Sequence, residues 1–260
     1  MTPVKLDPTP IPDGAAIVRT LPFTVTHKLI SDLLPRRGAV EVSGGPGCGK
    51  TKAVDEFFAS NDVVFVKIHL VSRLTGYGFL RKLISELGGD PRGDGDELIA
   101  ELRRLVDGRC LYVYIDEADL LNVHSLRQIR YLLDQRDIHI AWVLVGSNFE
   151  RAYKVCPELR SRVSFRVCFD PLAEAELVAH LAQFHPFLAS GESDLLLRID
   201  RQHCHGNWRV WSETLITLLD YAERQGITTL TQALAGQVLG VSAARPRKRR
   251  GTRPYPARKV

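Results

Sequence analysis

The amino-acid sequence predicts an α/β protein in which a five-stranded parallel sheet precedes a small all-helical domain. Between residues 39 and 170, short segments rich in apolar and β-branched residues alternate with segments of helical periodicity. Such alternation is typical of a parallel sheet covered by helices on both faces. After residue 173 only helical patterns follow. A glycine-rich turn also joins the first predicted strand directly to a helix.

Each element is predicted from its own periodicity and from the turn residues that end it. The predicted strands are 39–44, 63–70, 110–121, 138–148 and 163–172. The predicted helices of the α/β part are 23–34, 52–60, 77–87, 97–108 and 125–135. Those of the helical part are 176–184, 192–199, 208–225 and 229–239. We therefore expect three parts: a lead-in and α/β core over 1–170, a helical lid over 171–242 and a disordered tail over 243–260.

The positive charge is concentrated at the end of the chain. The net charge is +5, but the last sixteen residues hold eight of the 35 Lys and Arg residues and no acid. The remaining 27 basic residues are outnumbered by 30 acidic ones. A basic, Pro-rich tail without apolar periodicity is typical of disordered segments that neutralise nucleic-acid phosphates. A tail that only aids solubility has the same composition.

The composition argues against a membrane or secreted protein. Hydrophobic residues make up 45% of the chain, and no apolar run approaches the 18 or more residues of a membrane helix. The first residues contain no basic start followed by an apolar stretch. The cysteines show no C-x-x-C spacing, so we expect reduced thiols in a cytoplasmic protein.

A phosphate-binding loop is predicted between the first strand and the next helix. The stretch SGGPGCGKT satisfies G-x-x-x-x-G-K-[ST], with a strand before it and a helix after it. Its backbone N–H groups and the helix N-terminus suit phosphate oxygens. Lys50 is expected to reach the β- and γ-phosphates of ATP, and Thr51 to bind Mg²⁺. The predicted ATP-binding residues are Gly44, Gly45, Pro46, Gly47, Cys48, Gly49, Lys50 and Thr51.

Two acids end the third predicted strand, in the stretch LYVYIDEAD. Ligands of parallel sheets bind beyond the carboxyl ends of the strands. Asp116 is therefore expected to hold the magnesium together with Thr51, and Glu117 to polarise the attacking water. A strand-end acid pair without function is the alternative. The letters DEAD at 116–119 are also found in helicases, but such enzymes need a second domain for which this chain has no room.

Four polar residues later in the chain are candidates for a role in hydrolysis. Asn148 follows the fourth predicted strand and could orient the water. Arg160 and Arg162 lie just before the fifth strand, where an arginine more easily reaches the γ-phosphate of a neighbouring subunit than its own. Arg209 begins a helix in the helical part and could fold over the γ-phosphate. Each could instead be an ordinary surface residue.

These motifs, in this order and over residues 44 to 209, resemble the AAA+ ATPases, which have a P-loop α/β core and a helical lid. By that resemblance, Lys50 and Thr51 correspond to Walker A, and Asp116 and Glu117 to Walker B. Asn148 corresponds to sensor 1 and Arg209 to sensor 2. Arg162 best matches the arginine finger, with Arg160 as its rival. The resemblance implies an ATPase that uses ATP and Mg²⁺.

Within AAA+, the chain resembles the transposition regulators, the TnsC, MuB, TniB and IstB group. The segments over 15–34 and 66–89 resemble the group's lead-in and its second strand with the following helix. The chain is expected to be closest to compact TnsC, because no sizeable N-terminal domain precedes the core. The group assembles on DNA as ATP-dependent rings or filaments and presents that DNA to a transposase. The resemblance therefore implies a homo-oligomer on duplex DNA, a transposase partner, and a possible target-selection protein.

DNA binding would need basic residues on the inner face of such an assembly. No zinc knuckle, aromatic stacking pair or helix-turn-helix is visible, so we expect phosphate contacts with little sequence preference. Each basic residue taken singly is better explained as a solvated surface charge. The candidates are Arg73, Arg81, Lys82, Arg127, Arg130, and in the tail Arg247, Lys248, Arg249 and Arg250.

Two alternative functions remain open from the sequence. The chain could be another AAA+ ATPase, secretion-linked or initiator-like, whose assembly ignores DNA. It could also be a switch that binds ATP and barely hydrolyses it, although Glu117 argues against that. Nucleotide-dependent oligomers that form without DNA would favour the first alternative, and a turnover assay decides the second.

Overall fold

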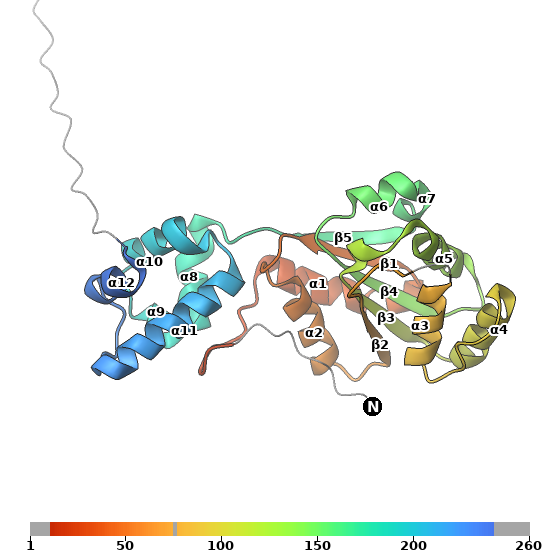
Figure 1. Ribbon diagram of the computed structural model, residues 1–260, viewed down its shortest axis with the longest axis horizontal. Helices are drawn as coiled ribbons and strands as arrows, with labels where there is room; N and C mark the ends of the chain where they lie inside the picture. The colour runs from red at the N-terminus through yellow and green to blue at the C-terminus, as the bar shows by residue number, and fades with distance from the viewer. Residues whose placement is uncertain (1–10, 75–76, 242–260) are drawn as a thin grey trace, which may run out of the picture.

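The computed structural model describes residues 11–74 and 77–241, and Figure 1 presents their arrangement. Within these residues a five-stranded sheet has the order β2-β3-β4-β1-β5, and each neighbouring pair is parallel. The α/β fold predicted from the sequence is thereby confirmed. The strands are β1 (Ala39–Gly44), β2 (Phe65–His69), β3 (Leu111–Asp116), β4 (Ile140–Val145) and β5 (Val163–Phe169).

Helices cover both faces of the sheet (Figure 1). On one face α1 and α2 pack against a cluster that contains Val40, Val42 and Phe57. On the other face α3 to α7 pack against a cluster that contains Ile115 and Leu144. Since both faces are buried at the centre of the sheet, β3 and β4 read as near-continuous apolar runs, whereas the edge strands β2 and β5 are partly exposed. The helices are α1 (Leu21–Ser31), α2 (Lys50–Ser60), α3 (Gly78–Glu86), α4 (Gly95–Val106), α5 (Val123–Asp134), α6 (Glu150–Val155) and α7 (Pro157–Arg160).

The chain after β5 is helical and has a hydrophobic core of its own, around Leu181, Trp211 and Leu215. Figure 1 places these helices at one end and the sheet at the other, with the segments before α1 and after β5 running between them. The helices are α8 (Glu174–Phe184), α9 (Pro186–Ala189), α10 (Ser193–Ile199), α11 (Trp208–Gln225) and α12 (Gln232–Leu239). The exact division into core, lid and tail stays a prediction.

Local sequence signals explain where the longer helices begin and end. Asp94 accepts hydrogen bonds from Asp96 N and Glu97 N, and the Glu97 side chain accepts from Asp94 N, which makes a capping box at the start of α4. Asn207 caps α11, and Gly226 ends it in a left-handed conformation. The sequence prediction lacked α6, α7, α9 and the π-helical turn Asp200–Cys204, which are each six residues or shorter.

The sheet also holds a buried acid. Glu41 in β1 is 6% exposed; its Oε2 accepts a hydrogen bond from the Tyr153 hydroxyl and lies 3.6 Å from Arg166 Nε. Burial and the neighbouring carboxylate raise the pKa of Tyr153. The partners satisfy a carboxylate that would otherwise be costly to bury.

None of the helices in the described part of the chain has the length and apolar character needed to span a bilayer.

Candidate nucleotide-binding site

The loop between β1 and α2 has the backbone geometry that a phosphate-binding turn requires. Gly44 has φ 144°, and a Cβ at that position would lie 2.1 Å from the carbonyl oxygen of Phe169 in the neighbouring strand β5. Gly49, at φ 95°, precedes the first residue of α2. Only glycine fits these conformations and this close approach. The loop therefore delivers the N-terminus of an eleven-residue helix to one end of the sheet, where its N–H groups suit an anion.

Lys50 lies inside this loop. Its side-chain amine donates hydrogen bonds to the carbonyl oxygens of Gly44 at 2.7 Å and Gly45 at 2.8 Å, and the residue is 8% exposed. Burial lowers the pKa of Lys50, and the negative groups around it, Glu117 and Asp116 included, oppose that shift. The amine is thus held at the centre of the loop, where it can bind phosphate oxygens.

Thr51 and Asp116 meet at the carboxyl ends of the strands, as the sequence predicts. Thr51 Oγ1 donates to Asp116 Oδ1 at 3.3 Å, and Asp116 is 6% exposed. A hydroxyl and a carboxylate at this separation fit Mg²⁺, a hard cation that prefers oxygen ligands. Thr51 and Asp116 would hold that ion. It would take its other ligands from phosphate and water.

Glu117 adopts an unusual backbone conformation beside Asp116. Its φ and ψ are 56° and 40°, a left-handed conformation that costs about 1 kcal/mol or more for a residue other than glycine. Its N–H donates to Asp116 Oδ1 at 3.1 Å. Burial raises the pKa of Glu117, and Asp116 and Asp119 raise it further. The strained turn directs the carboxylate to the edge of the phosphate loop, where a water-activating base would act.

Two further residues surround these acids, and sequence reasoning missed both. His69 ends β2 in register with Asp116, and its Nδ1 lies 3.5 Å from Asp116 Oδ2. Asp119 Oδ1 accepts a hydrogen bond from Ser147 N at 3.2 Å, which links the turn after β3 to the end of β4. The only sequence signal was position: His69 ends the strand beside β3, and Asp119 is the last residue of the DEAD stretch.

Two cavities lie against the phosphate loop. Gly47 and Gly49 of the loop line both cavities, and so does Arg209. The smaller, about 90 Å³, is lined by Lys50, Thr51, Asp116 and Glu117. The larger, about 570 Å³, is mainly apolar and lies between the core and the helical part. Its walls include Ala15, Ala16, Ile17, Val18, Phe23, Cys48, Phe169, Phe184 and Trp208.

This pair of cavities matches the two ends of a nucleotide. The smaller cavity offers a lysine, helix N–H groups and metal-binding oxygens, which suit phosphates. The larger offers apolar and aromatic walls, among them Phe184 and Trp208, whose rings pack edge to face with centroids 5.3 Å apart. A flat base is the kind of group such walls bind. The sequence did not predict Phe184 or Trp208 as site residues, because both read as apolar positions of helices.

The other predicted catalytic residues divide by location. Arg209 lines both cavities from the start of α11. Asn148 accepts a hydrogen bond from Glu150 N at 2.8 Å through its Oδ1, and Gly146 and Ser147 are the residues of this turn that line the smaller cavity. The structure therefore brings the turn after β4 to the site, with the Asn148 oxygen engaged at the start of α6.

Arg160 and Arg162 do not occur among the described residues that line either cavity. Arg162 Nε donates to Asp134 Oδ1 at 2.6 Å. The Arg160 guanidinium lies over the Tyr153 ring, 5.8 Å from its centroid. Both side chains are exposed and stand apart from their own nucleotide site.

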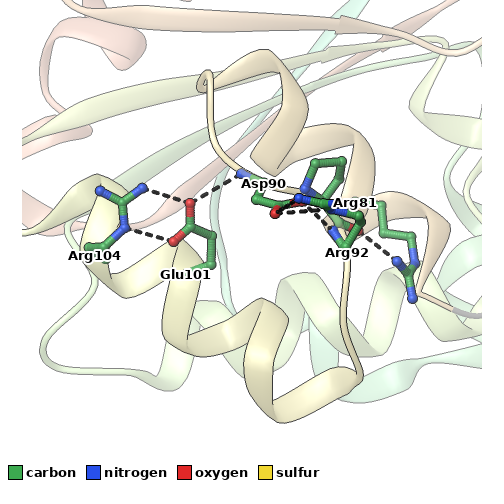
Figure 2. Close-up of polar contacts among 6 residues, drawn as sticks. Arg81, Asp90, Arg92, Glu101 and Arg104 are labelled. Carbon is green, nitrogen blue, oxygen red and sulfur yellow. Dashed lines mark hydrogen bonds and ion pairs between the residues drawn. The ribbon is translucent and has the colours of Figure 1, made fainter.

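The predicted DNA-binding residues differ in what they already contact. Arg81 donates to the carbonyl oxygens of Pro91 and Gly93, each at 2.6 Å. Figure 2 shows Arg81 beside the loop whose Asp90 N–H donates a hydrogen bond to the side chain of Glu101 on α4. Lys82 pairs with Glu86 at 3.7 Å, and Arg130 with Asp134 at 3.0 Å.

Arg73 and Arg127 are exposed. Arg73 lies in the segment after β2 and Arg127 on α5. Arg247, Lys248, Arg249 and Arg250 lie outside the described residues.

Comparisons with known proteins identify similar sequences and a similar fold. Residues 35–153 match the AAA domain family. The chain is 34% identical over 135 residues to the ATP-dependent target DNA activator B of Escherichia phage Mu, covering 51% of this chain and 42% of that protein. It is 33% identical over 135 residues to the protein of the same name from Escherichia phage D108, again covering 51% of this chain and 42% of that protein.

The chain thus spans less than half the length of these two relatives. Its fold resembles the crystal structure of Cdc6p from Pyrobaculum aerophilum, with a TM-score of 0.66 and 19% identity over 89% of this chain and 70% of that one. At that identity the likeness concerns the fold alone. With its P-loop fold, its contact between Thr51 and Asp116 and its match to the AAA domain family over residues 35–153, the chain is similar to AAA+ ATPases, and 135 of its residues align with the phage target DNA activators.

Proposed function

We propose that this chain is an ATP-hydrolysing regulator of DNA transposition. It binds ATP and Mg²⁺, assembles as a homo-oligomer on duplex DNA, and recruits or activates a transposase on that DNA. ATP hydrolysis dismantles the assembly. The observation that carries the proposal is the combination of the Lys50, Thr51 and Asp116 geometry with 34% identity to a protein named an ATP-dependent target DNA activator.

The roles of the site residues follow from their positions. Lys50 and the loop N–H groups bind the β- and γ-phosphates, and Thr51 and Asp116 hold the metal. Glu117 accepts a proton from the attacking water, and its strained turn supports this role because it brings the carboxylate beside the phosphate cavity. Bound Mg²⁺ supplies charge neutralisation for the phosphoryl group. The apolar cavity beside Trp208 receives the adenine.

Hydrolysis depends on assembly in this proposal. Arg162, with Arg160 as the alternative, completes the nucleotide site of a neighbouring copy by stabilising negative charge on the γ-phosphate. Neither arginine lines the nucleotide cavities of its own chain, which supports a role in the site of a neighbouring copy. Because Arg162 pairs with Asp134 within its own chain, it exchanges that carboxylate for the neighbour's phosphate when subunits join. Sensor roles for Asn148 and Arg209 belong to the same proposal.

Duplex DNA is bound through phosphates with little sequence preference. Arg73 and Arg127 are exposed, which supports a part for them in this contact. Arg81, Lys82 and Arg130 each have a partner in their own chain, so their release for phosphate binding would cost those contacts. The basic tail over 245–260 adds a sequence-independent attraction, since each basic residue near DNA displaces a counterion.

The proposal is tested by measuring ATP turnover with and without duplex DNA. Assembly on DNA brings an arginine to each nucleotide site, so we expect turnover per subunit to rise at least about tenfold when duplex is added. Duplexes of unrelated sequence should stimulate alike, and high salt should abolish the effect. Turnover that is the same with and without DNA, at every protein concentration, would contradict the proposal.

A further inference from the structure

The start of α11 is joined to the phosphate loop through the side chain of Asn207. Its Oδ1 accepts hydrogen bonds from Arg209 N at 3.0 Å and Val210 N at 3.2 Å, so it caps the helix. Its Nδ2 donates to the carbonyl oxygen of Pro46 at 2.9 Å. One amide group therefore uses its acceptor on the helical part and its donor on the loop that binds phosphate.

The loop is shaped to receive this amide. Gly47 has φ 76°, and a Cβ on it would lie 2.2 Å from Asn207 Oδ1. The Gly47 carbonyl oxygen also accepts from Arg209 N at 3.4 Å. Glycine at position 47 thus serves close contact with the helical part as well as the turn itself.

Residues before Asn207 hold it in a fixed place. Asp200, 5% exposed, accepts hydrogen bonds through Oδ1 from Gly206 N at 2.7 Å and from Trp211 Nε1 at 2.8 Å. The Gly206 carbonyl in turn accepts from Leu172 N at 2.9 Å. A buried acid therefore ties the turn before α11 to the helix itself, and this kind of supporting shell gives a contact its precision.

We infer that Asn207 is a positioning residue, which docks the helical part on the phosphate loop and so sets Arg209 over the nucleotide. The inference rests on the proposed nucleotide site and needs neither DNA nor a transposase. Pro46 and Gly47 turn their carbonyls toward α11, while Arg209, two residues beyond the amide, lines both cavities. A loop that moves on binding ATP would carry α11 with it.

The substitution Asn207→Asp separates the two uses of the amide. Aspartate caps a helix as well as asparagine does, but a carboxylate cannot donate to the Pro46 carbonyl. Asn207→Ser is a second variant, because serine also caps helices but its side chain is too short to bridge to the loop. Asn122→Asp is the matched control: Asn122 caps α5 and donates through Nδ2 to the Leu74 carbonyl, away from both cavities.

Binding of a fluorescent ATP analogue with Mg²⁺, without DNA, is the measurement. We expect Kd to rise about tenfold in Asn207→Asp and Asn207→Ser, the loss of one well-placed hydrogen bond, and to stay within twofold in Asn122→Asp. The midpoints of thermal unfolding should match that of the unmodified chain. Either Asn207 variant binding as tightly as the unmodified chain would overturn the inference.

A double-mutant cycle with Arg209→Ala identifies the positioning role. If Asn207 acts by placing Arg209, Asn207→Asp should weaken binding by less than twofold when Arg209 is already absent. If the Kd increases of the two single variants multiply in full in the double variant, the inference is overturned, because Asn207 would then act independently of Arg209. If the unmodified chain binds no nucleotide, the proposed nucleotide site is refuted, and the proposed function with it.

Discussion

Glu117 and Lys50 both line the phosphate cavity and are proposed to have different tasks. Lys50 is buried in the loop and bonded to its carbonyls, while Glu117 is exposed at the strand end in a strained conformation. Charge on the lysine supports binding of phosphate, whereas the carboxylate matters when water attacks. Substitutions at these two positions should therefore affect binding and hydrolysis separately.

Glu117→Gln should bind ATP normally and hydrolyse it about a hundredfold more slowly, since an amide of the same size cannot accept the proton of the attacking water. Any assembly on DNA should persist for longer. Equilibrium binding and single-turnover hydrolysis measure the two effects. Lys50→Ala is the contrasting variant and should lose binding itself; a Glu117→Gln chain that hydrolyses ATP at the original rate would refute the assigned role.

Among individual residues, the sequence predicted contacts between side chains that lie near the carboxyl ends of strands. Asp116 is the last residue of β3, and Thr51 lies in the first turn of α2, after the loop that follows β1; because the carboxyl ends of β1 and β3 share one edge of the parallel sheet, the contact was expected. The engagement of Asn148 with Glu150, and the places of His69 and Asp119, depend on the path of individual turns. Periodicity and spacing contain no information about such paths.

Arg160, the last residue of α7, and Arg162, between α7 and β5, are the arginines proposed to act between subunits. Arg162 pairs with Asp134, which also pairs with Arg130, and the Arg162 side chain is 44% exposed. An exposed ion pair contributes less than about 1 kcal/mol to folding. Substituting Arg162 should therefore leave the fold intact and affect only what the arginine does in an assembly.

Arg162→Ala should bind ATP normally and lower turnover on DNA by about a thousandfold. Mixing it with Glu117→Gln subunits, which should bind ATP and assemble, should restore part of the activity, because each Glu117→Gln subunit lends its arginine to a neighbour that can hydrolyse ATP. Arg160→Ala is the matched variant, with a smaller expected loss. The reverse order of losses would assign the role to Arg160, and no rescue on mixing would argue against a shared site.

The long and well-buried helices and strands were predicted from the sequence, and the shortest helices were missed. The central strands β3 and β4 are buried along their length and appear as apolar runs, and the partly exposed edge strands β2 and β5 were found from their β-branched and apolar residues. Helices α6, α7 and α9 have six residues or fewer, too few for a helical period to be visible. Glu41, a charged residue inside an apolar strand, reveals its place only through Tyr153 and Arg166, which lie more than 100 residues away in sequence.

At the scale of the whole molecule, the most basic segment lies at the end of the sequence, far in sequence from the phosphate loop at residues 44–51. The basic residues 245–260 lie outside the described part, and the proposal gives them an electrostatic role on DNA. The contact between α11 and the phosphate loop joins segments about 160 residues apart. No local pattern predicts a contact of this kind, because it depends on how the helical part docks on the core.

Removal of residues 245–260 should weaken DNA binding and flatten its dependence on salt. Each phosphate contact contributes about 0.9 to the slope of log affinity against log salt, so losing several of the eight basic residues should lower the slope by several units. Affinity measured over a range of salt concentrations gives the slope, and nucleotide binding should not change. A truncated chain with the full slope would exclude the tail from DNA binding.

We propose that ATP binding builds an oligomer of this chain on duplex DNA. The decisive experiment is electron microscopy of the protein with a non-hydrolysable ATP analogue, with and without duplex. We expect rings or filaments threaded on DNA, absent without nucleotide and absent in Lys50→Ala. Monomers in the presence of both ligands, or rings that form equally well without DNA, would contradict it; the latter would indicate another class of AAA+ ATPase.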